Sequence, residues 1–128
     1  MSAMVKPLIA TFEAGAAIAK GQAVKFSGNN KTVIKCSAAT DSVIGIAQNV
    51  ASSAGDLVEV ALPGGGAKAL AKATIALGDR LGVNADASLQ KLATQGDSEF
   101  AIAMDSAVAG DIFAVMVGKN TSAYAVQA

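Results

Sequence analysis

The chain contains no histidine, no tryptophan and a single cysteine, Cys36, among its 128 residues. The commonest general base and the commonest metal ligand are therefore missing, which excludes Ser-His-Asp and Cys-His catalytic arrangements. One cysteine cannot form an intrachain disulfide or complete a zinc or iron–sulfur site. We predict no catalytic residue, no metal, no cofactor and no enzymatic activity, and we expect Cys36 to be a small buried hydrophobe in a strand.

Neither a strong charge nor a long apolar run is present. Ten basic and ten acidic side chains are scattered singly along the chain and cancel to a net charge of zero. A basic stripe that could neutralise phosphates is absent, so we expect no nucleic-acid partner. No apolar stretch approaches the length of a membrane span, and residues 1–10 lack the apolar run of a secretory signal. We expect a soluble protein, made in the cytoplasm, with no membrane partner.

Two further kinds of site are excluded by spacing. The acidic residues recur one at a time at turns, and no Asp-x-Asp-x-Asp-Gly calcium loop is present. The glycine-rich segments at 62–68 and 118–121 lack the Gly-x-x-x-x-Gly-Lys-Ser/Thr spacing of a phosphate loop. These patterns favour turns and strand starts over calcium or nucleotide binding.

The chain does contain an internal repeat. Residues 41–47 and 55–60 (DSVIGIA and GDLVEV) return as residues 97–103 and 110–115 (DSEFAIA and GDIFAV), and residues 18–24 (IAKGQAV) return as 75–81 (IALGDRL). The repeat predicts two copies of one small β unit, at 16–62 and 73–117. We divide the chain into an N-terminal arm with the first strand (1–13), a single β domain (14–118) and a C-terminal tail (119–128).

Short segments rich in valine, isoleucine and phenylalanine recur at the 8 to 12 residue spacing typical of all-β domains. We therefore predict an all-β fold, a compact β-barrel or β-sandwich with little or no helix. Segment 112–117 is expected to be central and buried on both faces. Segment 67–73 alternates with period 2 and is assigned to a strand, with a short helix as the alternative. The remaining predicted strands are 8–13, 23–27, 32–36, 43–49, 56–62, 80–83, 89–93 and 100–105.

A glycine lies one or two residues before four of the predicted strands in the repeated units, at Gly21, Gly55, Gly78 and Gly110. We interpret these four as structural turn glycines, because glycine adopts positive φ without steric cost. The polar residue that follows each glycine can hydrogen-bond the turn backbone before the strand begins. Hairpin loops are expected at 27–30 and 84–88, which occupy equivalent places in the two copies.

The order of these motifs resembles that of the capsid cement, or head-decoration, proteins of tailed phages. Residues 43–62 (VIGIAQNVASSAGDLVEVAL) carry the resemblance, with support from 16–24 and 78–81, and it extends over about 8–117. Some members of that family are labelled as RecA-type recombinases, but the chain lacks the phosphate loop that such an activity requires.

The resemblance implies a structural virion protein, synthesised in the host cytoplasm, that binds the outer surface of the mature phage capsid and cements neighbouring major capsid subunits. It implies that the protein binds the major capsid protein and associates with itself as a homotrimer. It also implies an arm that becomes ordered on the capsid. The candidate contact residues in that arm are Met4, Val5, Lys6, Pro7, Leu8 and Ile9.

A small carbohydrate- or surface-binding β module is the alternative function. An exposed aromatic cluster would favour it. The aromatic residues available for such a cluster are Phe12, Phe26, Phe100, Phe113 and Tyr124.

Replacing Gly55 or Gly110 with valine should lower the melting temperature by several degrees, because a β-branched residue is strained at positive φ. Thermal unfolding followed by circular dichroism measures the effect. Unchanged melting in both variants would contradict the assignment of these glycines to turns.

Overall fold

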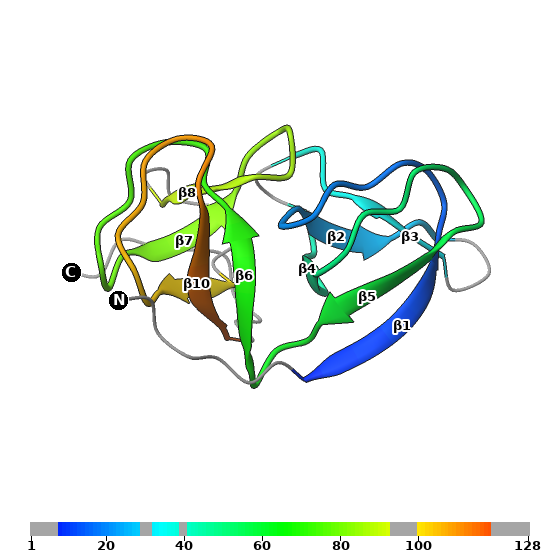
Figure 1. The fold of residues 1–128 in the computed structure, drawn as a ribbon, viewed down its shortest axis with the longest axis horizontal. Helices are drawn as coiled ribbons and strands as arrows, with labels where there is room; N and C mark the ends of the chain where they lie inside the picture. The colour runs from blue at the N-terminus through cyan, green and yellow to red at the C-terminus, as the bar shows by residue number, and fades with distance from the viewer. Residues whose placement is uncertain (1–7, 29–31, 39–40, 93–99, 119–128) are drawn as a thin grey trace.

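The computed structural model describes residues 8–28, 32–38, 41–92 and 100–118, and these residues form ten β-strands and no helix (Figure 1). The part of the chain that is described therefore has no helix that could span a membrane. The all-β prediction is confirmed. In chain order the strands are β1 (Ile9–Ala14), β2 (Ala23–Phe26), β3 (Thr32–Lys35), β4 (Gly45–Ala47), β5 (Leu57–Ala61), β6 (Gly66–Leu70), β7 (Arg80–Val83), β8 (Leu89–Lys91), β9 (Ala101–Ala103) and β10 (Ile112–Val117).

Strands β1 to β5 form a closed barrel, which we call unit 1. Its strand order is β1-β3-β2-β4-β5, and β5 pairs back onto β1. The pairing of β1 with β3 is parallel and short, joining Glu13 to Thr32 and Ala14 to Val33. Of the two architectures left open by the sequence, unit 1 is a barrel.

Strands β6 to β10 form a five-stranded sheet, unit 2, in the order β6-β10-β9-β7-β8. This order equals that of unit 1 when β6 stands for β1 and β10 for β5. The parallel pair of β1 with β3 is reduced in unit 2 to one parallel bridge between Ala71 and Leu89. Each unit begins with a strand, β1 or β6, that precedes the repeat recognised in the sequence. The duplicated pattern thus corresponds to two copies of one topology.

The predicted strands agree closely with those observed. The bounds of β7 and β10 agree with prediction to the residue, and β1 is shifted by one residue. Strands β2, β3 and β5 are one or two residues shorter than predicted, and β4, β8 and β9 are shorter by two to four residues. The strand predicted at 67–73 overlaps β6, which begins one residue earlier and ends three residues earlier, and in β6 Ala67 and Ala69 are buried while Lys68 is half-buried. Period 2 thus distinguishes the strand from the helix that alanine, leucine and lysine would favour on propensity alone.

One prediction about β10 is half wrong. The strand is central, between β6 and β9, but it is not buried on both faces. Ile112 and Met116 are 44% and 51% exposed, whereas Phe113 and Val115 are buried. The reason is that the sheet curls on itself, so only its inner face meets a core.

The hydrophobic core is continuous between the units. One cluster fills the barrel of unit 1, with Val24, Val33 and Val58 among its members. A larger cluster fills unit 2 and extends into unit 1 through four small or medium side chains: Ala23, Cys36, Ile46 and Ala61. Burial of each large side chain contributes about 1.5–3 kcal/mol. Because the larger cluster draws on both units, the core of unit 2 is completed by side chains of unit 1.

The outer edge of β6 is covered by unit 1. The Leu70 amide donates to the Gly21 carbonyl (3.0 Å). The Lys68 amide donates to Gln48 Oε1 (3.2 Å), and Gln48 Nε2 donates to the Lys68 carbonyl (3.1 Å). A strand edge with unpaired backbone groups is prone to unwanted pairing. Unit 1 therefore caps the edge of unit 2 with one turn and one side-chain amide.

Gly21 differs from the other turn glycines in its surroundings. All four have positive φ, between 88° and 95°. A Cβ at Gly21 would lie 2.7 Å from the Leu70 nitrogen, whereas a Cβ at Gly55, Gly78 or Gly110 would meet nothing within 4 Å. Positive φ and the close contact with β6 therefore both constrain residue 21, whereas only positive φ constrains the other three positions.

Gly21→Ala should destabilise the protein more than Gly55→Ala. Both variants place an alanine at positive φ, which costs about 1–2 kcal/mol. The Gly21 variant also overpacks the contact with β6, which adds about 1–3 kcal/mol. Urea unfolding measures both free energies, and equal losses would show that the approach of Gly21 to β6 carries no steric constraint.

Candidate interaction surface

The four glycine turns share one hydrogen-bond design. In each turn the side chain that follows the glycine accepts from the amide three residues earlier, and its own amide donates back to the carbonyl of that earlier residue. The side-chain distances range from 2.8 to 3.2 Å. The residue pairs are Ala19 with Gln22, Ser53 with Asp56, Ala76 with Asp79, and Val108 with Asp111. The three aspartates of these turns are therefore used as turn caps.

The turns lie in pairs. An antiparallel bridge joins Ile18 to Ala51 in unit 1, and the equivalent bridge joins Ile75 to Ala107 in unit 2. Each unit therefore presents two adjacent turns at its surface. The tips differ in character between the units, because Leu77 is a large exposed apolar side chain where unit 1 has Lys20.

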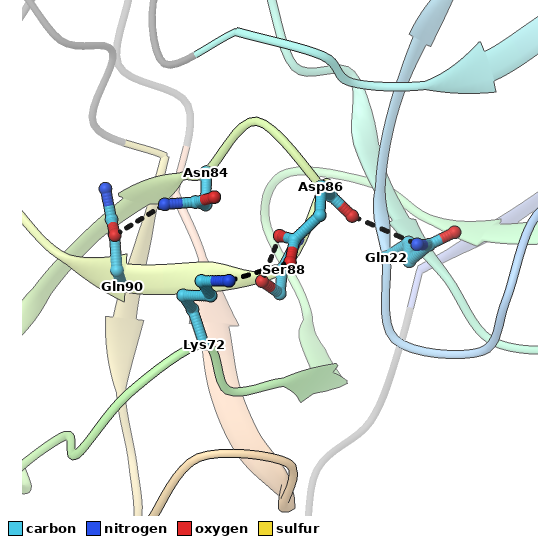
Figure 2. Close-up of polar contacts among 6 residues, drawn as sticks. All are labelled: Gln22, Lys72, Asn84, Asp86, Ser88 and Gln90. Carbon is cyan, nitrogen blue, oxygen red and sulfur yellow. Dashed lines mark hydrogen bonds and ion pairs between the residues drawn. The ribbon is translucent and has the colours of Figure 1, made fainter.

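Polar side chains join the two units on one side of their junction (Figure 2). Gln22 Nε2 donates to the Asp86 carbonyl (3.0 Å), which links the first turn of unit 1 to the β7–β8 hairpin. The Asp86 carboxylate accepts from Lys72 Nζ (3.2 Å) and from the Ser88 amide (3.1 Å). The Ser88 hydroxyl donates to the same carboxylate. One aspartate thus organises both the hairpin and its contact with unit 1.

The 84–88 loop was predicted as a hairpin and connects β7 to β8 as expected. Ala87 has a φ of 70° and its amide donates to the Asn84 carbonyl (2.9 Å). The Ala87 carbonyl accepts from the Ala23 amide of unit 1 (2.8 Å). Asn84 Nδ2 also donates to Gln90 Oε1 (2.8 Å) across the hairpin. In the equivalent loop of unit 1, Ser27 and Gly28 are described, and the positions at 29–30 lie outside the described residues.

Two aspartates have pKa values below the ordinary range. For Asp86, the Ser88 hydroxyl is the main cause, opposed by partial burial and assisted by the Ser88 amide and Lys72. For Asp41, partial burial alone would raise the pKa, but several donors together outweigh it. These donors are the Ser37 and Ala38 amides (2.8 and 3.0 Å) and Lys25 Nζ (2.9 Å). Both carboxylates therefore stabilise the fold in their ionised form.

Cys36 is fully buried, as predicted, and lies directly after β3 in the core shared by the units. Burial raises the pKa of its thiol to about 12, with a smaller contribution from the nearby Asp41 charge. A neutral, enclosed thiol is a poor nucleophile. Cys36 therefore acts as a packing residue.

The carboxylates and the thiol of the described residues do not gather at one place. Within the described residues, no three carboxylate or thiol groups come together to hold a metal ion. A shallow concavity of about 240 Å³ is lined by Gly78, Asp79, Arg80, Lys91 and Leu92. Asp79 is already committed to its turn, where it accepts from the Ala76 amide (2.8 Å).

The predicted arm is described only at its last two residues. Met4, Val5, Lys6 and Pro7 lie outside the described residues. Leu8 is 55% exposed, and its carbonyl accepts from the Leu62 amide (2.7 Å). Ile9 begins β1 and pairs with Ala61. Of the predicted arm, the structure thus places only Leu8, directly before β1, and Ile9, its first residue.

Aromatic side chains do not form an exposed cluster among the described residues. Phe100 and Phe113 are buried. Phe12 and Phe26 pack edge to face with ring centroids 5.6 Å apart, and half of the Phe26 side chain is exposed. Tyr124 lies outside the described residues. The described surface thus offers one exposed ring, which is little for a carbohydrate platform.

Sequence reasoning missed the junction residues Gln22, Gln48 and Asp86. The sequence does carry a signal for Gln22, because glutamine at this position replaces the aspartate that follows each of the other three turn glycines. An amide can accept from the turn and donate to a neighbour at once, whereas a carboxylate only accepts. Gln22 does both, bonding the Ala19 amide and the Asp86 carbonyl.

Comparison with known proteins found a matching family model and similar solved structures. Residues 4–62 match the family model of phage cement proteins, a little under half of the chain that includes all of unit 1. The family resemblance seen in the sequence is thereby confirmed. No curated protein matches.

A similar solved structure is the N base of the head fiber gp8.5 of bacteriophage phi29. The two chains are 17% identical and superpose with a TM-score of 0.69, over 93% of this chain and 98% of that one. The likeness at this identity shows a shared fold, and it extends over both units.

Acid should destabilise the protein through Asp41 and Asp86. A lowered folded-state pKa contributes stability above the unfolded value of about 3.9, and that stability is lost as pH falls through the folded pKa. The free energy of unfolding should therefore decrease from pH 5 to about pH 2. Asp41→Asn and Asp86→Asn should each weaken this pH dependence, because each removes one carboxylate that is stabilised in its ionised form. Equal pH dependence in all three proteins would contradict the role of both aspartates.

Proposed function

We propose that the protein is a structural component of a phage virion that binds the outer surface of the mature capsid and cements neighbouring major capsid subunits. The match of residues 4–62 to the phage cement family is the observation that carries this proposal. The matched segment contains the proposed arm together with the whole of unit 1. A head-associated neighbour with the same fold adds support.

The chemistry of the described residues is consistent with a structural role. The carboxylates of the repeated turns cap backbone amides, and the thiol is enclosed in the core. Polar groups at the junction are bonded to one another across the units. A rigid, duplicated scaffold suits a protein whose task is to hold other subunits in place.

The proposed mechanism is energetic. A protein that binds only the expanded capsid stabilises that form by linkage, by about 2.7 kcal/mol per site at a free concentration of one hundred times Kd. Many such sites on one shell act together through multivalency. Modest affinity at each site would therefore suffice to strengthen the shell against heat.

The arm is the proposed capsid contact, through Met4, Val5, Lys6, Pro7, Leu8 and Ile9. Leu8 supports this assignment because its side chain is exposed while its backbone is held against Leu62. An extended segment with apolar side chains can add a strand to a neighbouring sheet or loop. A homotrimer on the capsid, with zero net charge on each copy, would bring identical chains together with little repulsion.

The purified protein should bind expanded, empty heads of its own phage and raise their resistance to heat or chelator. Sedimentation of heads with bound protein, followed by thermal release of capsid protein, measures both effects. Unexpanded heads serve as the comparison. An absence of binding to mature heads would contradict the proposal. If the protein bound a glycan array specifically and did not bind heads, a carbohydrate-binding module would be favoured.

Leu8→Asp should lower the affinity for expanded heads at least tenfold, about 1.4 kcal/mol. The matched control is Val50→Asp, which places the same charge at a comparably exposed apolar side chain outside the arm. Both variants should melt like the parent protein. Equal head binding by the two variants would show that the arm is not the contact.

A further inference from the structure

One row of side chains crosses the wall of unit 1 where that wall meets unit 2. The pairing registers place Ile46 of β4 opposite both Ala61 of β5 and Ala23 of β2. Cys36 extends the row, because its amide donates to the Ala23 carbonyl (2.9 Å). All four side chains are fully buried in the larger core and do not belong to the cluster inside the barrel. This row is the face that unit 1 presents to unit 2.

The equivalent row of unit 2 is exposed at its centre. The registers place Ile102 of β9 opposite both Met116 of β10 and Arg80 of β7. The Leu92 amide donates to the Arg80 carbonyl (3.0 Å), as that of Cys36 does in unit 1. These strands lie side by side in the sheet (Figure 1). Ile102 and Met116 are 41% and 51% exposed, so two large apolar side chains of unit 2 lie in solvent at positions that unit 1 buries.

The exposed pair belongs to a wider apolar face on β9 and β10. Ile112, Ala114 and Met116 alternate onto this face of β10. The Met104 amide donates to the Ala114 carbonyl (2.9 Å), which extends the face beyond the end of β9. Gly66 lies opposite Met116 on β6 and has no side chain to cover it. Methionine adapts to irregular partners and is enriched at protein interfaces, so this composition is typical of a contact surface.

Basic side chains border the apolar face on both sides. Lys68 of β6 lies opposite Ala114, and Arg80 of β7 lies opposite Ile102. The Asp105 carboxylate, which lies close by, accepts from the Ala114 amide (3.2 Å). A surface complementary to this face therefore combines apolar side chains with carboxylates.

A second copy of the chain does not suit this face. The contact within the chain depends on the small side chains of Ala23 and Ala61. Their counterparts in unit 2, Arg80 and Met116, are too large for the same close approach. A two-fold contact of the face with itself would also bring Lys68 and Arg80 of both copies together, and like charges repel. The shape and the charge of the face both favour a different protein as its partner.

We propose that this face, centred on Ile102 and Met116, binds an apolar and acidic surface of the major capsid subunit. The inference rests on the proposed function, and it adds a contact on unit 2 to the arm that precedes unit 1. The face lies outside residues 4–62, which match the phage cement family. Two contacts on one molecule raise the overall affinity, because the second forms at a high effective concentration once the first is made.

The first test changes the charge at the centre of the face. Met116→Glu should weaken binding to expanded heads about tenfold or more, because a carboxylate would meet an apolar and acidic partner. Met116→Lys keeps an aliphatic stem and adds a positive charge, so its loss of affinity should be smaller. Val108→Glu is the matched control, since Val108 is a comparably exposed apolar side chain (58%) on a turn of unit 2 outside the face. Sedimentation with heads measures the affinities, and all three variants should melt like the parent protein.

The outcomes separate this contact from the proposed function. Equal head binding by Met116→Glu and Val108→Glu, with the parent protein bound, would overturn the contact and leave the cementing role in place. A greater loss in Met116→Lys than in Met116→Glu would overturn the acidic character of the partner. Failure of the parent protein to bind heads would overturn the proposed function and this inference with it.

The second test follows Met116 in the unaltered chain, so it does not depend on the folding of a variant. Hydrogen peroxide transfers one oxygen atom to an accessible thioether and leaves as water, and mass spectrometry locates the sulfoxide. Met116 should oxidise readily in the free protein and several times more slowly on expanded heads. Val108→Met is the control, and its introduced thioether should oxidise at the same rate in both samples.

Equal oxidation of Met116 in the free and the head-bound protein would contradict the contact. Protection of Met116 that grows with protein concentration in the absence of heads would show that another copy covers the face. That result would also overturn the assignment of the face to the capsid subunit.

Discussion

The close approach of the Gly21 backbone to strand β6 is the contact on which the two-unit arrangement depends. A Cβ at Gly21 would lie 2.7 Å from the Leu70 nitrogen, so a larger residue would hold the units apart. With the units in contact, Gln48 can reach the Lys68 backbone and Gln22 can reach Asp86. The same approach encloses Cys36 and Ile46 in the larger core. Backbone pairing, the polar junction and apolar burial therefore share one steric requirement.

Small side chains make this arrangement possible. Alanine is the commonest residue of the chain, and many of the buried positions in both cores are alanines. Gly45 shows how tight the packing is, because a Cβ there would lie 2.2 Å from the Ala61 carbonyl of the neighbouring strand. Narrow five-stranded units leave little interior volume, and alanine and valine fill it at ordinary packing density. The scarcity of aromatic residues thus follows from the width of the units.

Local features of the fold were predictable from the sequence, and non-local ones were not. The glycine turns and the bounds of β7 and β10 follow from short-range rules on positive φ and on alternation. The order of strands in the sheets depends on pairings such as Ile9 with Ala61, which no local pattern encodes. The outward face of β10 was misjudged because an apolar run has the same appearance in a buried strand and in the wall of a barrel. Gln22 marked the junction by breaking the Gly-Asp pattern, but its partner Asp86 is 64 residues away.

The closed order of unit 1 has a consequence for synthesis. Strand β1 emerges from the ribosome first, yet its main partner, β5, follows only after the other three strands of the barrel. At about 5–20 residues per second, the nascent β1 waits several seconds for that partner. Of its side chains, only Ile9 and Phe12 are large and apolar, while Thr11 and Glu13 are polar. The composition of β1 thus limits adhesion between nascent chains during the interval before the barrel can close.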